Sequence, residues 1–560
     1  MITSCISSLI WFERLDQATI NCPRLLEDES DYPFIINGKF WFVSPVPGAF
    51  LYINQIPELL ASCCVLRVGL INDERSQRMM KKIINFFLNG TAKELSVGAE
   101  TTVLELLRGT FALNGIKEGC GEGDCGACTV VIGEVFNGTV HYKSAAGCLY
   151  LAAKLEGKHL ITIEGMAGKE KLHPIQQAIL DAHATQCGFC TPGVSLSILA
   201  LYLENENPTK EEFRRYLEGN LCRCTGYAAI KKVPEYLNDL IIDMDDIRMK
   251  YLSAVEKKQL AFKEEEILID DGEKAYYSPV TQTGLMEFLS SHPEYRQGTG
   301  LRFLNGGSDI VVGIKKRKQH FRLLVDLSRL EKMQEIRTDN GALIIGGGVT
   351  LARIINETRD IFPELADTVL KMCSEQVRSS ATMTGNIVNA SPVADTVPLL
   401  MAVEAVITLM SADGTRMVPV RDFFHGYKNT ENRADEWISS VLIPLGGYNF
   451  IHFEKVSKRR EVDISSVNSA LALRIEDGII RKAGAACGGV GATTLYMKET
   501  SEFLTGKMIC EDTFYKTFAI IDKEAAPISD VRGSAEYRKT LLQNLLIKHY
   551  LAYKNKSAME

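Results

Sequence analysis

The chain concentrates eight of its 15 cysteines into two short groups between residues 120 and 224, and this placement constrains the fold most. The first group begins in GCGEGDCGAC, residues 119–128, where three thiols share a loop with glycines that cannot fill a core. Such grouping argues against a scattered disulfide framework. Clustered thiols instead indicate metal or redox chemistry in a reducing cytoplasm.

The spacing of the first group predicts the metal centre. Cys120-x4-Cys125-x2-Cys128, followed by Cys148, is the plant-type [2Fe–2S] spacing. Three thiolates on one loop must point inward while backbone N–H groups face the sulfurs, and the glycines supply the positive φ that so tight a loop needs. Structural zinc is the alternative, but zinc sites favour paired C-x2-C sequences. We therefore expect these four cysteines to bind a [2Fe–2S] cluster.

The second group consists of Cys187-x2-Cys190 and Cys222-x-Cys224. Spacing alone leaves zinc and a second cluster both open. Two pairs of helical stretches, each flanking a cysteine-bearing loop, are predicted at 174–184, 193–205, 209–219 and 228–241. This setting favours a second [2Fe–2S] cluster at the centre of a small helical bundle.

Length and composition bound the remaining possibilities. A chain of 560 residues exceeds one ordinary core, so three or more domains are expected. The net charge of −7 gives no support for nucleic-acid binding. We find no apolar stretch of about 18 residues that predicts a membrane span, and no evident signal peptide.

Residues 1–79 show no sustained apolar period, whereas an Asn-Gly turn at 89–90 between alternating segments predicts a hairpin. Our hypothesis is that translation starts at Met79 or Met80 and that residues 1–78 do not belong to the fold. A genuine extension is the alternative, and the intact mass of the natively expressed protein decides between them.

The second half of the chain carries two glycine turns, NGGSDIVVGIK at 305–315 and IGGG at 345–348. Neither is a dinucleotide fingerprint or a P-loop, so ordinary turns are the alternative. Adjacent backbone N–H groups in such turns can nevertheless form a nest for a pyrophosphate. The charge-rich stretch 245–272 is weakly patterned and predicts a linker.

EGCGEGDCGACTV, QCGFCTPG and LCRCTGY resemble the molybdenum hydroxylase superfamily, the xanthine dehydrogenase and aldehyde oxidase group. The resemblance continues through SSATMTGNIVNASPVADTVPLLMA (379–402), DFFHGYKNT (422–430), FEKVSKRREVDIS (453–465) and PISDVRGSAEYRK (527–539). It implies a multidomain α+β fold. The implied parts are an unmatched N-terminal extension (1–79), a β-grasp ferredoxin-like [2Fe–2S] domain (80–168), a four-helix [2Fe–2S] domain (169–244), a linker (245–274), a two-subdomain, PCMH-like α+β FAD-binding domain (275–448) and an α+β C-terminal domain like that of CO dehydrogenase flavoprotein (449–557).

The resemblance also implies the cofactor contacts. The expected FAD contacts are Leu304, Asn305, Gly306, Gly307, Ser308, Asp309, Thr382, Met383, Thr384, Gly385, Asn386, Asp395 and Lys455. Asp395 suits the ribityl or ribose hydroxyls, and Lys455 suits the electron-rich end of the flavin ring, unless it belongs to a solvated basic run. Thr384 replaces a glycine usual in the family, so we expect its side chain to crowd the phosphate. Gln186 would contact the pterin of a partner's molybdenum cofactor, or is an ordinary helix-end residue.

The implied function is electron transfer, with no catalytic residue in this chain. The resemblance points to the iron–sulfur/FAD small subunit of a xanthine dehydrogenase-type oxidoreductase of purine metabolism. It would work with a molybdopterin-binding large subunit in a heterotetramer, passing electrons through two [2Fe–2S] clusters to FAD and then to NAD⁺. The alternatives are the equivalent subunit of an aldehyde or N-heterocycle hydroxylase, a stand-alone NAD(P)H reductase, and a zinc-stapled interaction protein. Oxygen or a ferredoxin as the final acceptor also stays open.

Overall fold

The computed structural model describes residues 34–36, 39–43, 50–52, 83–168, 171–241, 244–296 and 300–559. The chain divides into two compact units, Met1–Met79 and Met80–Glu560. In the first unit, the described residues form an antiparallel sheet of Phe34–Ile36 (β1), Lys39–Val43 (β2) and Phe50–Tyr52 (β3). Most of residues 1–78 lie outside the described residues, so the proposed start at Met79 or Met80 stays a hypothesis.

The second unit begins with a five-stranded mixed sheet, and its strands are Ile84–Leu88 (β4), Thr91–Leu95 (β5), Thr129–Phe136 (β6), Thr139–Ala146 (β7) and His159–Ile161 (β8). The strand order is β5-β4-β8-β6-β7, with β4 and β8 parallel. The predicted hairpin turn is confirmed, because Asn89 and Gly90 both have positive φ between β4 and β5. Together with a short helix at Val103–Glu105 (α3), this sheet confirms the β-grasp prediction.

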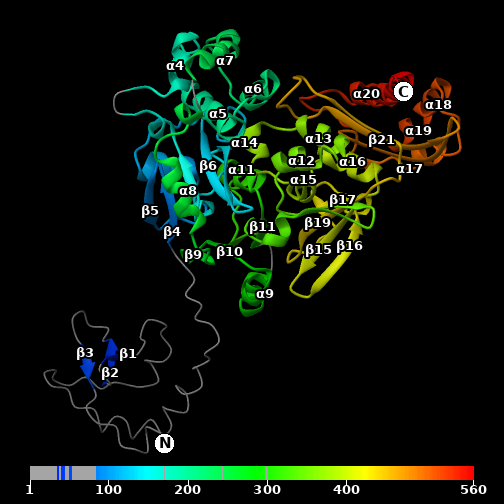
Figure 1. The fold of residues 1–560 in the computed structure, drawn as a ribbon. Coiled ribbons are helices and arrows are strands. Elements are labelled where there is room, and N and C mark those ends of the chain that lie inside the picture. The colour runs from blue at the N-terminus through cyan, green and yellow to red at the C-terminus, as the bar shows by residue number, and fades with distance from the viewer. Residues whose placement is uncertain are drawn as a thin grey trace, which may run out of the picture. The chain divides into compact units, whose positions relative to one another are not determined.

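The four predicted helices follow as Pro174–Asp181 (α4), Thr191–Glu204 (α5), Lys210–Leu217 (α6) and Ala228–Leu240 (α7) (Figure 1). Helix α5 is buried over ten consecutive residues because β6, β7 and α6 all pack against it. This burial explains why its apolar residues follow no helical period, and it joins the helical domain firmly to the sheet.

The prediction of a linker at 245–272 is wrong. The segment contains a helix, Leu252–Leu260 (α8), and a strand, Ile267–Asp270 (β9). Three side chains at helical spacing, Leu252, Val255 and Gln259, are buried, and α8 packs against β6 and β7. The many charges of this segment occupy the exposed face and hide this stripe in the sequence. Strand β9 pairs with Ala275–Ser278 (β10), so the next domain begins before residue 275.

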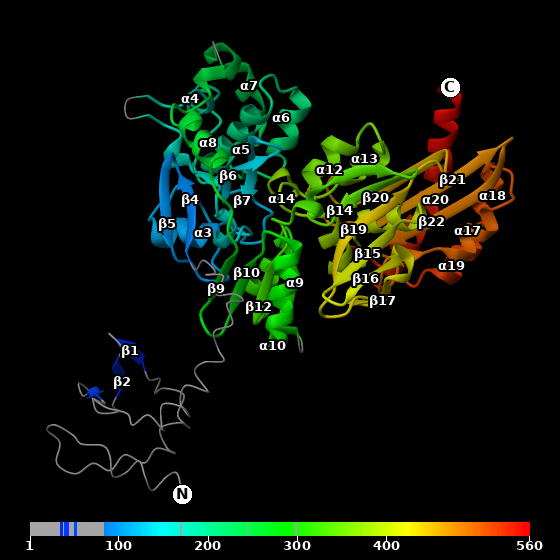
Figure 2. The same ribbon diagram turned by 60° about the horizontal axis from the view of Figure 1, so that its bottom comes forward.

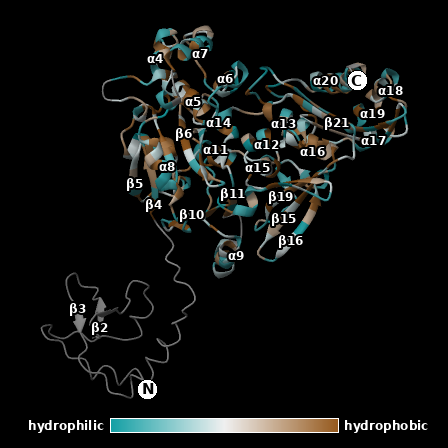
Figure 3. Ribbon diagram, viewed as in Figure 1, coloured by the Kyte–Doolittle hydropathy of each residue, from teal (hydrophilic) through white to brown (hydrophobic). Residues whose placement is uncertain are grey.

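The flavin half has the predicted two subdomains. One sheet has the order β11-β12-β10-β9, with β11 at Leu301–Leu304 and β12 at Leu323–Asp326. The other has the order β13-β14-β19-β15-β16, and its strands are Ile336–Asp339, Ala342–Gly346, Trp437–Pro444, Val406–Ser411 and Gly414–Pro419. Helix α16 (Thr396–Ala402) is buried at all seven residues and is largely hydrophobic in colour (Figure 3). It lies in the main core of this half.

The C-terminal part is an antiparallel sheet with the order β20-β21-β22-β23, formed by Phe450–Val456, Val467–Glu476, Ile479–Gly488 and Leu495–Tyr496. Helices α17 (Lys498–Leu504) and α20 (Ala535–Met559) pack against it (Figure 2). This arrangement confirms the predicted α+β domain. Within the described ranges, the structure contains no helix long and apolar enough to span a membrane.

Candidate functional site

The inner cysteine group, Cys120, Cys125, Cys128 and Cys148, converges in the structure. The thiol of Cys120 interacts with those of Cys125 and Cys148, and Cys128 interacts with Cys148. The backbone N–H groups of residues 122 and 124 each donate to Cys120 Sγ at 3.3 Å. The two neighbouring thiols and these N–H groups lower the pKa of the Cys120 thiol. The surroundings of Cys120 therefore favour its thiolate, which is the form that binds iron, whereas the same thiol contacts raise the pKa of Cys125 and Cys148.

The glycines of the inner loop are required by its geometry. Gly121, Gly123 and Gly126 have φ of 68°, 85° and 66°, where a side chain is strained. A Cβ on Gly123 would also lie 2.5 Å from a methyl carbon of Leu149. The prediction that this loop needs glycines because its backbone adopts positive φ is therefore confirmed.

The outer cysteine group, Cys187, Cys190, Cys222 and Cys224, forms two thiol pairs. Cys187 interacts with Cys224, and Cys190 interacts with Cys222. Burial and the contact with Cys222 raise the pKa of Cys190 to about 12. Cys187 and Cys224 are exposed, so this group lies at the surface of the chain.

Neither cysteine group resembles a closed site for one ion. Among the described residues, no group of three or more His, Cys, Asp or Glu side chains is arranged to hold a single metal ion. Structural zinc needs four ligands around one centre, whereas the four thiolates of a [2Fe–2S] cluster are shared between two irons. The inner thiols contact one another in a chain and the outer thiols in two pairs, and the assignment of these cysteines as cluster ligands stays a prediction.

The two cysteine groups are joined through the backbone. Leu221 N–H, next to Cys222, donates to the carbonyl of Cys125 at 3.0 Å. The Asn220 side chain donates to the carbonyl of Gly126 at 3.2 Å. A single hydrogen bond therefore links the peptide of an inner cysteine to the loop that carries two outer cysteines.

This junction depends on a glycine of α5. A Cβ on Gly193 would lie 2.2 Å from the carbonyl oxygen of Gly126. Gly193→Ala is expected to destabilise the chain by about 1–3 kcal/mol, because the overlap forces the two domains apart. Thermal unfolding measures this effect. Gly109→Ala is the control, since a Cβ there meets nothing within 4 Å, and equal melting of both variants would contradict the prediction.

The predicted flavin turn follows β11. Gly307 has φ of 76° and precedes helix α11 (Ser308–Arg317), and a Cβ on Gly306 would lie 2.1 Å from the carbonyl of Ser380. Asn305 donates from Nδ2 to Gly347 O at 2.9 Å, whereas its buried Oδ1 has no hydrogen-bond partner within the described part of the chain. Close backbone approach, a helix N-terminus and an unpaired polar atom fit a cofactor with a pyrophosphate and hydroxyl groups.

The other predicted flavin segment lies beside this turn. Thr382 caps helix α15 (Met383–Asn389) by accepting from Gly385 N at 3.0 Å. The Thr384 hydroxyl donates to Gly347 O at 2.6 Å, and this side chain is 3% exposed. The hydroxyl of Thr384 is therefore tied to the IGGG turn. The three glycine-containing segments meet at one place, and the FAD contacts assigned to them remain a proposal.

Asp395 and Lys455, which are both expected to contact FAD, form an ion pair with each other. Lys455 Nζ donates to Asp395 Oδ2 at 2.7 Å, and the two side chains are 4% and 9% exposed. Ser465 and Asn468 donate to the other carboxylate oxygen at 2.5 and 2.7 Å. Lys455 is thus buried and does not belong to a solvated basic run. Its ammonium and the carboxylate of Asp395, both predicted to contact the flavin, form an ion pair with each other.

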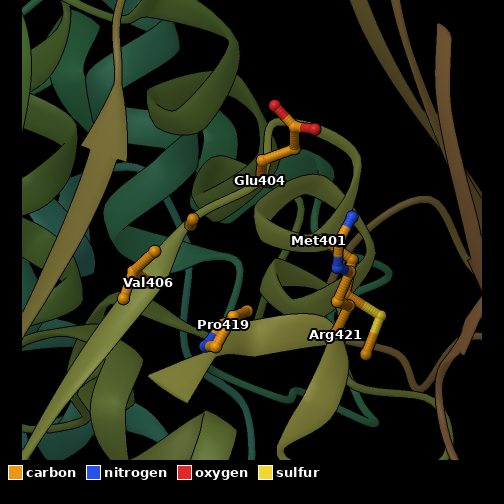
Figure 4. Close-up of a pocket in the computed structure, with 6 residues that line it drawn as sticks. Met401, Glu404, Val406, Pro419 and Arg421 are labelled. Atoms are coloured by element: carbon orange, nitrogen blue, oxygen red, sulfur yellow. The ribbon is translucent and has the colours of Figure 1, made fainter. Parts of the chain in front are cut away.

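Two hollows differ in their relation to the site. A small one is lined by Gly306 and Ser308 of the flavin turn and by Leu149 and Tyr150, which follow Cys148. The inner cysteine group and the flavin turn are therefore neighbours. A larger one of about 170 Å³ is lined by Met401, Glu404, Ala405, Val406, Pro419 and Arg421 (Figure 4). It contains none of the predicted site residues, so we assign it no role.

Sequence reasoning missed a buried polar network between the domains. Gln376 Nε2 donates to Ser197 Oγ at 2.9 Å and to Asn220 Oδ1 at 3.0 Å. Arg378, which is fully buried, pairs with Glu218 at 2.5 Å. These contacts fix the outer cysteine loop against the flavin half, and no local pattern could have revealed pairs more than 150 residues apart.

Four family models match successive parts of the chain. They describe a 2Fe-2S iron-sulfur cluster binding domain (86–151), a [2Fe-2S] binding domain (162–233), an FAD binding domain in molybdopterin dehydrogenase (270–446) and a CO dehydrogenase flavoprotein C-terminal domain (452–553). The matches define an iron–sulfur flavoprotein with two [2Fe–2S] domains and one FAD-binding domain.

The chain belongs to the molybdenum hydroxylase superfamily. It is 28% identical to xanthine dehydrogenase of Blastobotrys adeninivorans over 83% of this chain and 40% of that protein. It is 29% identical to aldehyde oxidase 1 of Bos taurus over 83% of this chain and 39% of that protein. The chain thus spans about two fifths of the length of these relatives. Reconstituted CO dehydrogenase from Oligotropha carboxidovorans aligns with a TM-score of 0.46 and 26% identity, over 50% of this chain and 96% of that one.

Proposed function

We propose that the chain is the electron-transfer subunit of a xanthine dehydrogenase-type enzyme. Electrons from a molybdopterin-binding large subunit would pass through the outer cysteine group, then the inner cysteine group, to FAD and on to NAD⁺. The bound FAD would supply the exchange between one-electron and two-electron transfer. A heterotetramer working in the reducing cytoplasm is the expected assembly.

The linear order of the sites carries this proposal. The outer cysteine group lies at the surface, and one backbone hydrogen bond from Leu221 to Cys125 joins its loop to the inner cysteine group. Residues that follow Cys148 share a small hollow with the flavin turn. The contacts therefore connect the exposed outer cysteine group, where electrons would enter, to the flavin turn through the inner cysteine group.

The surface at the entry point suits a partner subunit. Gln186 and Cys187 are both exposed. Three large side chains from the outer cysteine loops, Phe189, Leu221 and Tyr227, are 47%, 44% and 36% exposed. Aromatic and apolar residues are enriched in the core of an interface, and the exposed position of Gln186 leaves its proposed contact with the partner's pterin open to test.

Co-expression with a molybdopterin-binding large subunit tests the function. We expect a complex of two copies of each subunit, containing molybdenum, FAD and two [2Fe–2S] clusters per chain. Anaerobic xanthine should bleach the iron–sulfur and flavin absorption, and NAD⁺ should restore it. Absence of iron–sulfur and flavin absorption from the purified chain would overturn the proposal.

A second candidate is the equivalent subunit of an aldehyde or N-heterocycle hydroxylase, which the similarity to aldehyde oxidase 1 supports. In that case an aldehyde or an N-heterocycle bleaches the complex and xanthine does not. A stand-alone reductase would give two results together. NADH would reduce the isolated chain, and no molybdopterin-binding partner would donate electrons to it.

A further inference from the structure

A buried lysine of the first domain enters the flavin half. Lys154 lies in the short helical turn Ala152–Leu155, soon after Cys148, and its side chain is 6% exposed. Its ammonium donates to Asn305 O at 2.7 Å, to Asp326 Oδ2 at 2.8 Å and to Ser328 Oγ at 3.1 Å. All three donors of the lysine are used, and every acceptor belongs to the flavin half.

The anionic partner of Lys154 is equally well satisfied. Asp326 is 1% exposed, and it also accepts from Tyr276 Oη at 2.6 Å and from Ser328 N at 2.9 Å. A buried ion pair is tolerated when the remaining hydrogen-bonding groups are paired in this way. Asp326 neutralises the charge of Lys154. The hydrogen bond from Lys154 to the Asn305 carbonyl is therefore not needed for charge neutralisation.

The bond to Asn305 fixes a peptide plane of the flavin turn. A trans peptide directs its C=O and the following N–H in opposite directions. While Lys154 holds the Asn305 carbonyl, the N–H of Gly306 must point away from the lysine. The backbone at Gly306 runs close to residue 380, because a Cβ built on Gly306 would lie 2.1 Å from the carbonyl oxygen of Ser380. A fixed N–H direction of this kind is what an anion-binding turn requires.

We propose that Lys154 is a positioning residue for FAD. The iron–sulfur domain holds the flavin turn in its pyrophosphate-binding conformation, so that FAD affinity depends on a side chain of the neighbouring domain. This inference rests on the proposed FAD site at 304–309. The lysine does not touch the cofactor; it acts through the peptide between residues 305 and 306.

Lys154→Met tests the inference in the full chain. We expect the Kd of the deflavinated protein for FAD to rise about tenfold or more, since a hydrogen bond to a charged group is lost. Flavin fluorescence quenching measures the Kd. Iron content, sulfide content and the spectrum of the inner cluster should stay unchanged, which shows that the domain itself is folded.

Three further variants separate positioning from general damage. Lys158→Met is the matched control, because Lys158 donates to Glu134 and Tyr150 within its own domain, and we expect it to retain wild-type FAD affinity. Lys154→Arg should restore part of the affinity. The double variant Lys154→Met/Asp326→Asn removes the unpaired carboxylate and should still bind FAD weakly.

The outcomes distinguish this inference from the proposed function. A wild-type chain that binds no FAD would overturn the proposed flavin site itself. A wild-type chain that binds FAD, together with Lys154→Met of equal affinity, would overturn only the role of Lys154. Recovery of affinity in the double variant would also overturn it, because the loss would then come from the buried Asp326.

Discussion

Cys148→Ser should remove about half of the iron from the purified chain and abolish the spectrum of one cluster. Cys148 is 4% exposed, and its thiol interacts with those of Cys120 and Cys128. Serine replaces a soft thiolate with a hard hydroxyl, which binds the irons of a [2Fe–2S] cluster poorly. Iron and sulfide analysis with electron paramagnetic resonance of the reduced protein measures the loss.

Two other variants check that the loss is specific. Cys222→Ser should remove the other cluster and leave the one that Cys148→Ser removes. Cys487→Ala changes a fully buried cysteine outside both groups, and it should keep all the iron. Equal loss from Cys487→Ala and Cys148→Ser would contradict the ligand assignment, as would full retention of iron in Cys148→Ser.

The inner cysteine loop could be predicted in detail because its determinants are local. The spacing of its three thiols, the glycines between them and their positive φ all lie within ten residues. The same holds for the hairpin at Asn89 and Gly90 and for the four helices around the outer cysteine group. In each case one short segment contains both the pattern and its physical cause.

The remaining features depend on contacts between distant segments. Lys154 meets Asp326 across 172 residues, and Gln376 meets Ser197 across 179. One signal was available, since Lys154 is a lone charge within the apolar stretch LYLAAKL and therefore needs a buried partner. The sequence could not identify that partner. The helix at 252–260 was hidden for another reason, because its three charged residues equal its three buried side chains in number and one of those buried side chains, Gln259, is polar.

Lys455→Met should lower the free energy of unfolding by about 3–5 kcal/mol, because it leaves a buried carboxylate without its cation. Of the donors that the described residues supply, Asp395 would keep the two neutral ones, Ser465 and Asn468. Chemical denaturation followed by circular dichroism measures the change. Lys458→Met is the control, since Lys458 is exposed and its ammonium bonds only a backbone carbonyl of Val531 among the described residues, and it should stay within about 0.5 kcal/mol of wild type.

The double variant Lys455→Met/Asp395→Asn separates stability from the proposed flavin role. Removing both charges should recover most of the stability, because a neutral pair has a much smaller desolvation cost. If Lys455 also stabilises the reduced flavin, the midpoint potential of bound FAD should still fall in the double variant. Recovery of both stability and potential would mean that the ion pair only supports the fold, and the predicted contact of Lys455 with the flavin ring would be wrong.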